Sequence, residues 1–330
     1  MSQKPSDRLE TEARLRQTAD FGSHLVAHGH SDHTVRNYCR DIDAFFQFAV
    51  GAGIVRVRKS EVPGHIVEAN PDSLRELAPE NIAAFVRSLF RAGLSNRTVE
   101  RRLAALRTFF RYLCRVEEMS DNPAQIVPGP KVVKNPPVFL TVDEAKTLVE
   151  SAGEKRTFFE LRDRAILELH YSTGIRVSEL CSLSLLDLDL RSGQMRVKGK
   201  GKKERLVPFG NMALESLRNY LGVRATPSAK YKGPKHKNEA AVFLNREGSR
   251  LSTRSVNKLV HKYVAKSGIM KEIGPHKLRH TCATHLYSAG MELRHLQELL
   301  GHKNISTTSI YTHTNIDRLK RVHKKAHPRA

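Results

Sequence analysis

Near the carboxyl end of the sequence, two histidines, an arginine and a tyrosine recur at short intervals. His276 is followed three residues later by Arg279, and His302, in the string LGH, is followed nine residues later by Tyr311. The planar fork of an arginine grips two phosphate oxygens at once, and a histidine donates hydrogen bonds or transfers protons. A tyrosine phenolate can form a covalent intermediate with the group that it attacks. These residue types at this spacing predict a metal-free attack on a phosphodiester.

The chain carries the positive charge that a nucleic-acid substrate requires. Its 330 residues include 56 Lys and Arg against 34 Asp and Glu, a formal net charge of +22. An excess of this size favours a polyanionic partner, most simply nucleic acid. Charge alone leaves open a merely soluble basic protein or one of ribosomal type. With 39% hydrophobic residues, the chain is long and apolar enough for two globular domains.

Metal, cofactor and membrane signals are weak in this sequence. The four cysteines, Cys39, Cys114, Cys181 and Cys282, are far apart and form no CxxC pair, which favours free thiols in a reducing cytoplasm. The string HKLRHTCATH invites a zinc site at histidines four residues apart, but it lacks the HExxH glutamate and an upstream cysteine pair. The amino-terminal residues are polar, and no apolar run approaches the ~20 residues of a membrane span. We therefore expect a cytoplasmic protein without metal, cofactor or membrane contact.

The apolar periodicity divides the chain into two helical regions joined by a proline-rich stretch. Residues 1–20 form a charged lead-in, and helical patterns follow in 21–125, whereas 51–73 has no long period and indicates an irregular connection. The string NPAQIVPGPKVVKNPPVF contains five prolines, which disfavour both helix and sheet. We expect a helical domain at 21–125, a linker at 126–138 and a second domain at 139–330.

The clearest helix of the first region carries a row of basic residues. Its apolar positions step by four, three, four and three residues, from Val99 to Leu113. Arginines follow the same helix with few acidic residues to balance them. They form either a solvated face or a surface for backbone phosphates, and we favour phosphate contact. The candidates are Arg97, Arg101, Arg107 and Arg111.

Local signals also predict the elements of the second region. Thr141 and Glu144 form a capping-box pattern, and a helix from Phe158 should end at Gly174. The string QMRVKGKGKKERLVPF predicts a β-hairpin with a Gly- and Lys-rich turn. Further helices are expected from a cap at Ser252 or Thr253, over 276–289, and over 293–300, the last stopped by Gly301. Tyr287 lies in an apolar helical pattern and is expected in the core, unlike Tyr311.

Four ordered strings make the sequence resemble a known family. TGIRVSEL, VKGKGKKERLVP, HKLRHTCATHL and LQELLGHKNISTTSIYTH are similar to the catalytic domain of the tyrosine recombinases, most closely the bacterial Xer branch. The string LSNRTVERRLAALRTFFRYL is similar to their helical DNA-clamping domain, so the resemblance covers roughly residues 25–330. It implies a mainly α two-domain fold with a small β-hairpin in the catalytic domain. It also implies strand exchange through a 3′-phosphotyrosyl bond, without metal or ATP.

The resemblance assigns roles to individual residues of this sequence. Arg176, in TGIR, and Arg279 would clamp the scissile phosphate, and Glu179 would brace that region. His276 would accept a proton or bind the phosphate, and His302 would donate a hydrogen bond to it.

Two further residues would carry the covalent chemistry. Lys200, in the turn of the hairpin, would protonate the leaving 5′-oxygen, and Tyr311 would be the nucleophile. The neighbouring Lys198, Lys202 and Lys203 are alternatives to Lys200 and candidates for contacts to backbone phosphate.

The resemblance also implies partners. Four protomers, identical or paired with a Xer paralogue, would assemble on two double-stranded DNA sites at the nucleoid, under a DNA translocase of the FtsK type. The basic segment after Tyr311 would dock on a neighbouring protomer. Chromosome or plasmid dimer resolution at cell division is the preferred role. Integration of a mobile element, type IB topoisomerase-like strand passage and a non-catalytic DNA-binding module are the alternatives.

Overall fold

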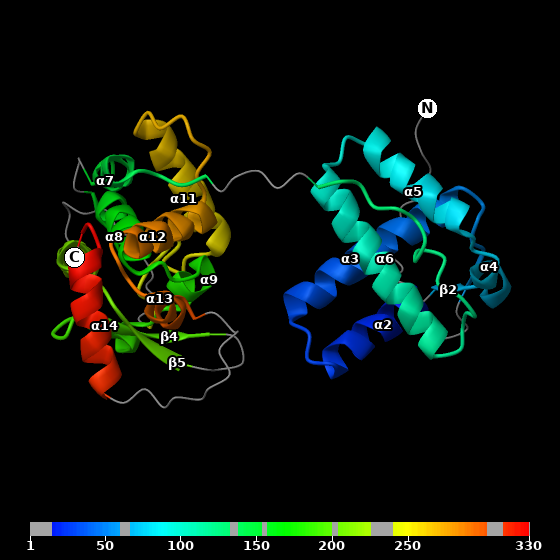
Figure 1. Cartoon of the computed structure of the whole chain (residues 1–330), viewed down its shortest axis with the longest axis horizontal. Coiled ribbons are helices and arrows are strands. Elements are labelled where there is room, and N and C mark those ends of the chain that lie inside the picture. Colours follow the sequence, from blue (N-terminus) through cyan, green and yellow to red (C-terminus); the bar gives the residue numbers. More distant parts are fainter. Residues whose placement is uncertain are drawn as a thin grey trace. The chain divides into compact units, whose positions relative to one another are not determined.

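The computed structural model describes residues 15–59, 67–132, 138–153, 157–199, 204–225, 240–301 and 313–329. The chain forms two compact units, Met1–Asn135 and Pro136–Ala330, and each has its own hydrophobic core (Figure 1). Both units are mainly helical, and the only sheets in the described ranges are small and antiparallel, which confirms the predicted fold class. No described helix is both long and apolar enough to cross a membrane.

The first unit packs its helices around a core rich in phenylalanine. The longest helices start at serine caps, since the Ser31 and Ser95 hydroxyls accept hydrogen bonds from the Thr34 and Thr98 amides. Phe45 meets Phe85 and Phe110 edge to face. The elements are α2 (Arg16–Ala27), α3 (Asp32–Gly51), β1 (Val57–Lys59), β2 (Val67–Ala69), α4 (Pro71–Arg75), α5 (Pro79–Arg91) and α6 (Asn96–Arg115).

The segment after α3 is more ordered than its sequence pattern suggested. The expectation of an irregular connection over 51–73 was wrong, because β1 and β2 pair antiparallel with Val57 opposite Ala69. Asn70 then caps helix α4, because its side chain accepts hydrogen bonds from two amides of the first turn. Strands of three residues are too short to show a period, and their pairing depends on partners about ten residues away.

The proline-rich stretch begins inside the first unit. Ala124 and Val127 are buried in its core, and the Arg107 guanidinium on α6 donates to both of their carbonyls, at 3.2 and 2.7 Å. The Asn122 side-chain amide donates to the Arg107 carbonyl at 2.9 Å. Prolines exclude regular structure, but the residues between them still bury apolar surface.

The second unit is built around a nearly fully buried helix, α8, which packs against α7, α10 and α12. Figure 1 shows α7 and α12 beside α8. Its sheet has the order β3-β4-β5, with Gln194 to Lys198 paired antiparallel to Pro208 to Glu204. The elements are α7 (Val142–Glu150), α8 (Phe158–Thr173), α9 (Val177–Ser182), a 3₁₀ turn (Leu185–Asp187), β3 (Leu188–Asp189), β4 (Gln194–Lys198), β5 (Glu204–Pro208), α10 (Asn211–Ala225), α11 (Thr253–Lys266), α12 (Pro275–Ser288), α13 (Leu293–Leu300) and α14 (His313–Ala326).

The local signals for helix ends are confirmed in this unit. The Thr141 hydroxyl accepts from the Glu144 amide while the Glu144 carboxylate accepts from the Thr141 amide, at 3.2 and 2.7 Å. Gly174 and Gly301 end α8 and α13 in the left-handed conformation, with φ of +58° and +69°. The expectation of a core position for Tyr287 was wrong, because 60% of this residue is exposed on α12.

Three side chains in and just after the carboxyl-terminal helix α14 bind groups of α8 in the same unit. The imidazoles of His323 and His327 donate to the carbonyls of Ser172 and Tyr171, at 2.7 and 3.1 Å. The Arg329 guanidinium binds both carboxylate oxygens of the buried Glu168 and one oxygen of Glu150. The resemblance led us to expect docking on a neighbouring protomer, whereas in this single chain the described part of the tail docks on its own unit.

Acid should destabilise the second unit through His327. Burial, then the nearby charge of His323, lower the pKa of His327 from 6.5 to about 3. Below about pH 6.5, His327 is therefore protonated in the unfolded chain but stays neutral in the folded chain. Its contribution to the free energy of unfolding is complete above that pH and is lost as the pH decreases. For His327 alone the loss of stability at pH 5.5 is on the order of 1 kcal/mol.

Urea denaturation of wild type and His327→Gln at pH 7.5 and 5.5 measures this loss. Glutamine keeps a donor for the Tyr171 carbonyl but cannot take up the proton. We expect the wild type to lose more free energy of unfolding on acidification than the variant. Equal losses in the two proteins would show that His327 does not carry the effect.

Candidate active site

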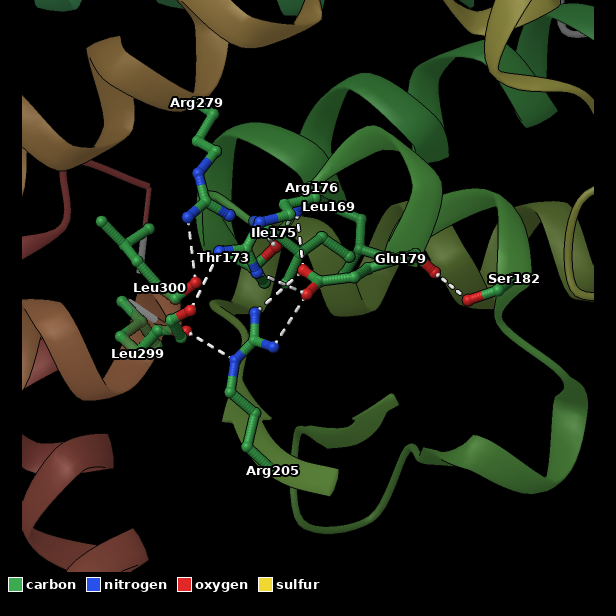
Figure 2. Close-up of polar contacts among 11 residues, drawn as sticks. Leu169, Thr173, Ile175, Arg176, Glu179, Ser182, Arg205, Arg279, Leu299 and Leu300 are labelled. Atoms are coloured by element: carbon green, nitrogen blue, oxygen red, sulfur yellow. Dashed lines mark hydrogen bonds and ion pairs between the residues drawn. The ribbon is translucent and has the colours of Figure 1, made fainter. Parts of the chain in front are cut away.

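Two of the predicted phosphate-binding arginines converge on the end of helix α13. Arg176 follows the Gly174 turn directly before α9, and Arg279 lies on the second turn of α12 (Figure 2). Arg176 Nη2 donates to the Gly301 carbonyl and Arg279 Nη2 donates to the Leu300 carbonyl, both at 2.9 Å. These carbonyls belong to the negative end of the helix dipole, which favours cations. The structure thus joins three sequence motifs that lie up to 125 residues apart.

Glu179 holds Arg176 in this arrangement. Its carboxylate accepts from the Arg176 amide at 2.8 Å and from Arg176 Nη1 at 2.9 Å, which is a capping contact at the start of α9. Glu179 is only 4% exposed, so its charge needs partners. The brace that the resemblance assigned to Glu179 therefore has a physical counterpart, although its role in catalysis is still a prediction.

A third arginine completes the network, and sequence reasoning missed it. Arg205 on β5 donates Nη1 and Nη2 to the two carboxylate oxygens of Glu179, at 3.0 and 2.9 Å. Its Nε donates to the Leu299 carbonyl at 3.0 Å (Figure 2). Arg205 was hidden in the basic run KGKGKKERLVP, but strand alternation would place it on the same face as Val207, which is buried. A basic residue on the core face of a strand requires a buried partner.

The electrostatics of the site favour an anion. Burial would raise the pKa of Glu179, but the hydrogen bonds and charge of Arg205, then the backbone and side-chain hydrogen bonds of Arg176, lower this pKa below its ordinary value, so the carboxylate is ionised. Burial and then the charge of Arg176 lower the pKa of Arg279 to about 10, so this guanidinium stays charged at neutral pH. Arg176 and Arg205 bind the Glu179 carboxylate, and Arg279 is influenced by its charge, so three guanidinium groups stand against one carboxylate. A phosphate would supply negative charge to this group.

Two glycines allow the helix ends to approach. A Cβ on Gly174 would lie 2.9 Å from Leu300 Cδ2, and one on Gly301 would lie 2.9 Å from Arg205 Cζ. Both residues also need the positive φ that side chains disfavour. The turn that carries Arg176 and the end of α13 are therefore packed against each other with no room for a side chain.

The other predicted catalytic residues are only partly visible. His276 is exposed on the first turn of α12, three residues before Arg279. Lys200, Lys202, Lys203, His302 and Tyr311 lie outside the described residues. Within the described ranges, no three side chains of metal-ligating type come together in a way that could hold a metal ion.

The predicted phosphate contacts of the first unit have different surroundings. Arg97 and Arg111 are exposed on α6. Arg101 binds the buried Asp41, and Arg107 is held by the carbonyls of Ala124 and Val127. In the second unit, Lys198 is exposed, and its ammonium lies 4.0 Å from the Glu204 carboxylate. Contacts of these residues with DNA stay predictions, and the surroundings favour Arg97, Arg111 and Lys198.

Comparisons with known proteins match both units. The family model described as "Phage integrase family" matches residues 138–318, and "Phage integrase, N-terminal SAM-like domain" matches residues 60–117. The chain is 43% identical over 310 residues to "Tyrosine recombinase XerC" of Thermodesulfovibrio yellowstonii, covering 94% of this chain and 95% of that protein. It is 40% identical to the protein of the same name from Syntrophus aciditrophicus, covering 91% and 93%.

Solved structures share the fold at lower identity. A lambda integrase dimer, residues 75–356, bound to a COC′ core site matches with a TM-score of 0.63 and 20% identity, over 89% of this chain and 97% of that one. The XerH recombinase bound to difH in a pre-cleavage complex matches with a TM-score of 0.61 and 23% identity, over 88% and 76%.

Proposed function

This chain belongs to the phage integrase family, the tyrosine recombinases, and we propose that it is a Xer-type site-specific recombinase of double-stranded DNA. The observation that carries the proposal is the convergence of Arg176 and Arg279 on the last carbonyls of α13. Arg176 binds the Gly301 carbonyl, and the predicted phosphate donor His302 is the next residue in the sequence. The curated relatives named XerC, at up to 95% coverage of their own length, favour the Xer branch over a phage-type integrase or a topoisomerase.

The chemistry assigns one task to each predicted residue. Tyr311 would give its phenolic proton to His276 and attack the scissile phosphorus. The bond from phosphorus to the 5′-oxygen would break as the phosphotyrosyl bond forms, and Lys200 would protonate that oxygen to give a free 5′-hydroxyl. Arg176, Arg279 and His302 would neutralise the charge that develops on the non-bridging oxygens. The phosphotyrosyl bond would conserve the energy of the broken phosphodiester, so that a 5′-hydroxyl from a second site could reverse the step without ATP.

We further propose that the protein resolves chromosome dimers at cell division. Four protomers, either identical or paired with a Xer paralogue, would act on two sites at the nucleoid in the cytoplasm, under a DNA translocase of the FtsK type. In that assembly, α14 would leave its own unit and dock on a neighbour. Curated relatives named XerC support this biological role over the integration of a mobile element.

Covalent capture on genomic DNA tests the proposal. The purified protein is incubated with sheared DNA of its own organism in excess EDTA, and the DNA that stays bound in detergent is sequenced. We expect covalent 3′ ends at one short paired chromosomal site, in EDTA as well, because side-chain cations supply the positive charge.

Other outcomes of this capture would contradict the proposal. If no DNA is captured covalently, the protein does not have the proposed recombinase activity. Adducts scattered without a shared site, together with relaxation of plasmids that lack a site, would indicate a topoisomerase. Adducts at the ends of a mobile element would indicate an integrase.

A further inference from the structure

Arg205 lies where three parts of the candidate site meet, namely β5, α9 and the end of α13. It is 7% exposed, and its guanidinium binds both oxygens of Glu179 and, through Nε, the Leu299 carbonyl. It comes from the hairpin strand β5, Glu179 comes from α9, and Leu299 comes from α13. Because the guanidinium group is planar and rigid, donating to Glu179 on one side and to Leu299 on the other fixes the relative positions of these three elements.

The surroundings of Arg205 indicate that the end of α13 is shaped around it. Three consecutive carbonyls, of Leu299, Leu300 and Gly301, accept hydrogen bonds from Arg205, Arg279 and Arg176 respectively. A Cβ on Gly301 would lie 2.9 Å from both Cζ and Nη1 of Arg205. Any side chain at the residue before His302 would therefore displace this guanidinium.

Arg205 also affects how much charge Arg176 can offer to a phosphate. Arg176 Nη1 and Arg205 Nη1 share the same oxygen of Glu179. With Arg205 in place, the carboxylate is neutralised largely inside the unit, and the guanidinium of Arg176, whose side chain is 44% exposed, keeps surplus positive charge. Without Arg205, Arg176 alone would neutralise the Glu179 carboxylate, and less of its positive charge would remain for a phosphate.

We propose that Arg205 is a positioning residue for DNA cleavage, which acts by holding Glu179 and the end of α13 so that Arg176 is aligned and charged for the scissile phosphate. This inference rests on the proposed function. Arg205 itself does not touch the DNA in this scheme, so its loss should slow the cleavage step and leave DNA affinity nearly unchanged.

The test compares wild type, Arg205→Lys and the control Arg196→Lys in single-turnover cleavage of a nicked suicide substrate that carries the captured site. Arg196 lies on the neighbouring strand β4, is exposed, and pairs with Glu204. Lysine retains the charge but cannot bind both Glu179 oxygens and the Leu299 carbonyl at once. We expect the rate constant of Arg205→Lys to fall about 100-fold, the effect of a small misplacement, with an unchanged cleaved fraction. Arg196→Lys should match the wild type.

A second substrate separates positioning from folding. A methylphosphonate at the scissile position lacks the charged oxygen that the arginines neutralise, so misalignment of Arg176 matters less. We expect the deficit of Arg205→Lys relative to wild type to shrink to about 10-fold or less on this substrate. Equal deficits on both substrates, or a lower cleaved fraction at an unchanged rate constant, would show a purely structural role and overturn the proposal.

Two further arms keep the test decisive. A substrate with a 5′-bridging sulfur has a leaving group that needs no proton, so its rescue of Arg205→Lys would assign the effect to Lys200 and overturn the proposal. If Arg205→Lys does not fold, Arg205→Gln, which still donates to the Leu299 carbonyl, replaces it in every arm. Absence of cleavage by wild type would refute the proposed function, whereas normal cleavage by the variant would refute this inference alone.

Discussion

Tyr311→Phe should abolish covalent capture of DNA. The substitution removes only the hydroxyl, so the phosphorus has no side-chain nucleophile, while the ring and the rest of the site are unchanged. We expect adduct formation on a suicide substrate to fall by at least about 10⁴-fold, the scale on which loss of a nucleophile acts in covalent catalysis. Denaturing gels of labelled substrate measure the adduct, and native gels measure binding of the same DNA, which should be retained.

Tyr287→Phe is the matched control for this experiment. Tyr287 is an exposed tyrosine on α12, in the same unit, and it has no role in the proposed chemistry. The variant should form the adduct at the wild-type rate. A phosphotyrosyl adduct with Tyr311→Phe, or its loss with Tyr287→Phe alone, would show that the nucleophile is misassigned.

Arg279→Lys should have the second-largest effect, because it changes the phosphate clamp and its support together. Arg279 is 8% exposed and donates to the Leu300 carbonyl. A lysine has one compact ammonium group, so it cannot bind a phosphate in the forked manner and hold this carbonyl at the same time. We expect the cleavage rate constant to fall about 10²- to 10³-fold, as for removal of one preorganised donor to a transition-state oxyanion.

Binding and a surface arginine provide the controls. DNA affinity depends on many phosphate contacts, so it should change little in Arg279→Lys when it is measured at fixed salt. Arg294→Lys alters an exposed arginine of α13 that pairs with Glu298, and it should cleave normally. If Arg279→Lys weakened binding as much as cleavage, Arg279 would contribute to DNA affinity rather than to the chemical step.

The sequence predicted those elements whose signals are local. The Thr141 cap and the stops at Gly174 and Gly301 each depend on a few neighbouring residues, and all three are confirmed. The paired strands β1 and β2 were missed because each has only three residues, too few to show an alternating pattern, and their partners lie about ten residues apart in the sequence. The exposure of Tyr287 was missed because a helical pattern shows which residues share a face, not whether a neighbouring element covers it.

The candidate site was predicted only where a motif carried it. Arg176 and Arg279 belong to strings that resemble a family, and the structure brings them together. Arg205 stood among lysines and other arginines, and its burial depends on a carboxylate 26 residues away that reaches it only after folding. In the same way, the sequence suggested that Arg107 belongs to a basic face, but in the structure its guanidinium donates to the carbonyls of Ala124 and Val127.

The anchoring of Arg329 has a practical consequence for handling the protein. Its guanidinium is bound to Glu168, which is fully buried on α8, and the neighbouring carbonyls of Tyr171 and Ser172 hold the imidazoles of the tail. The same helix leads within a few residues to Arg176. A tag or fusion placed close after Arg329 would crowd this attachment and disturb the turn that carries Arg176, so purification handles and fluorescent fusions belong at the amino end.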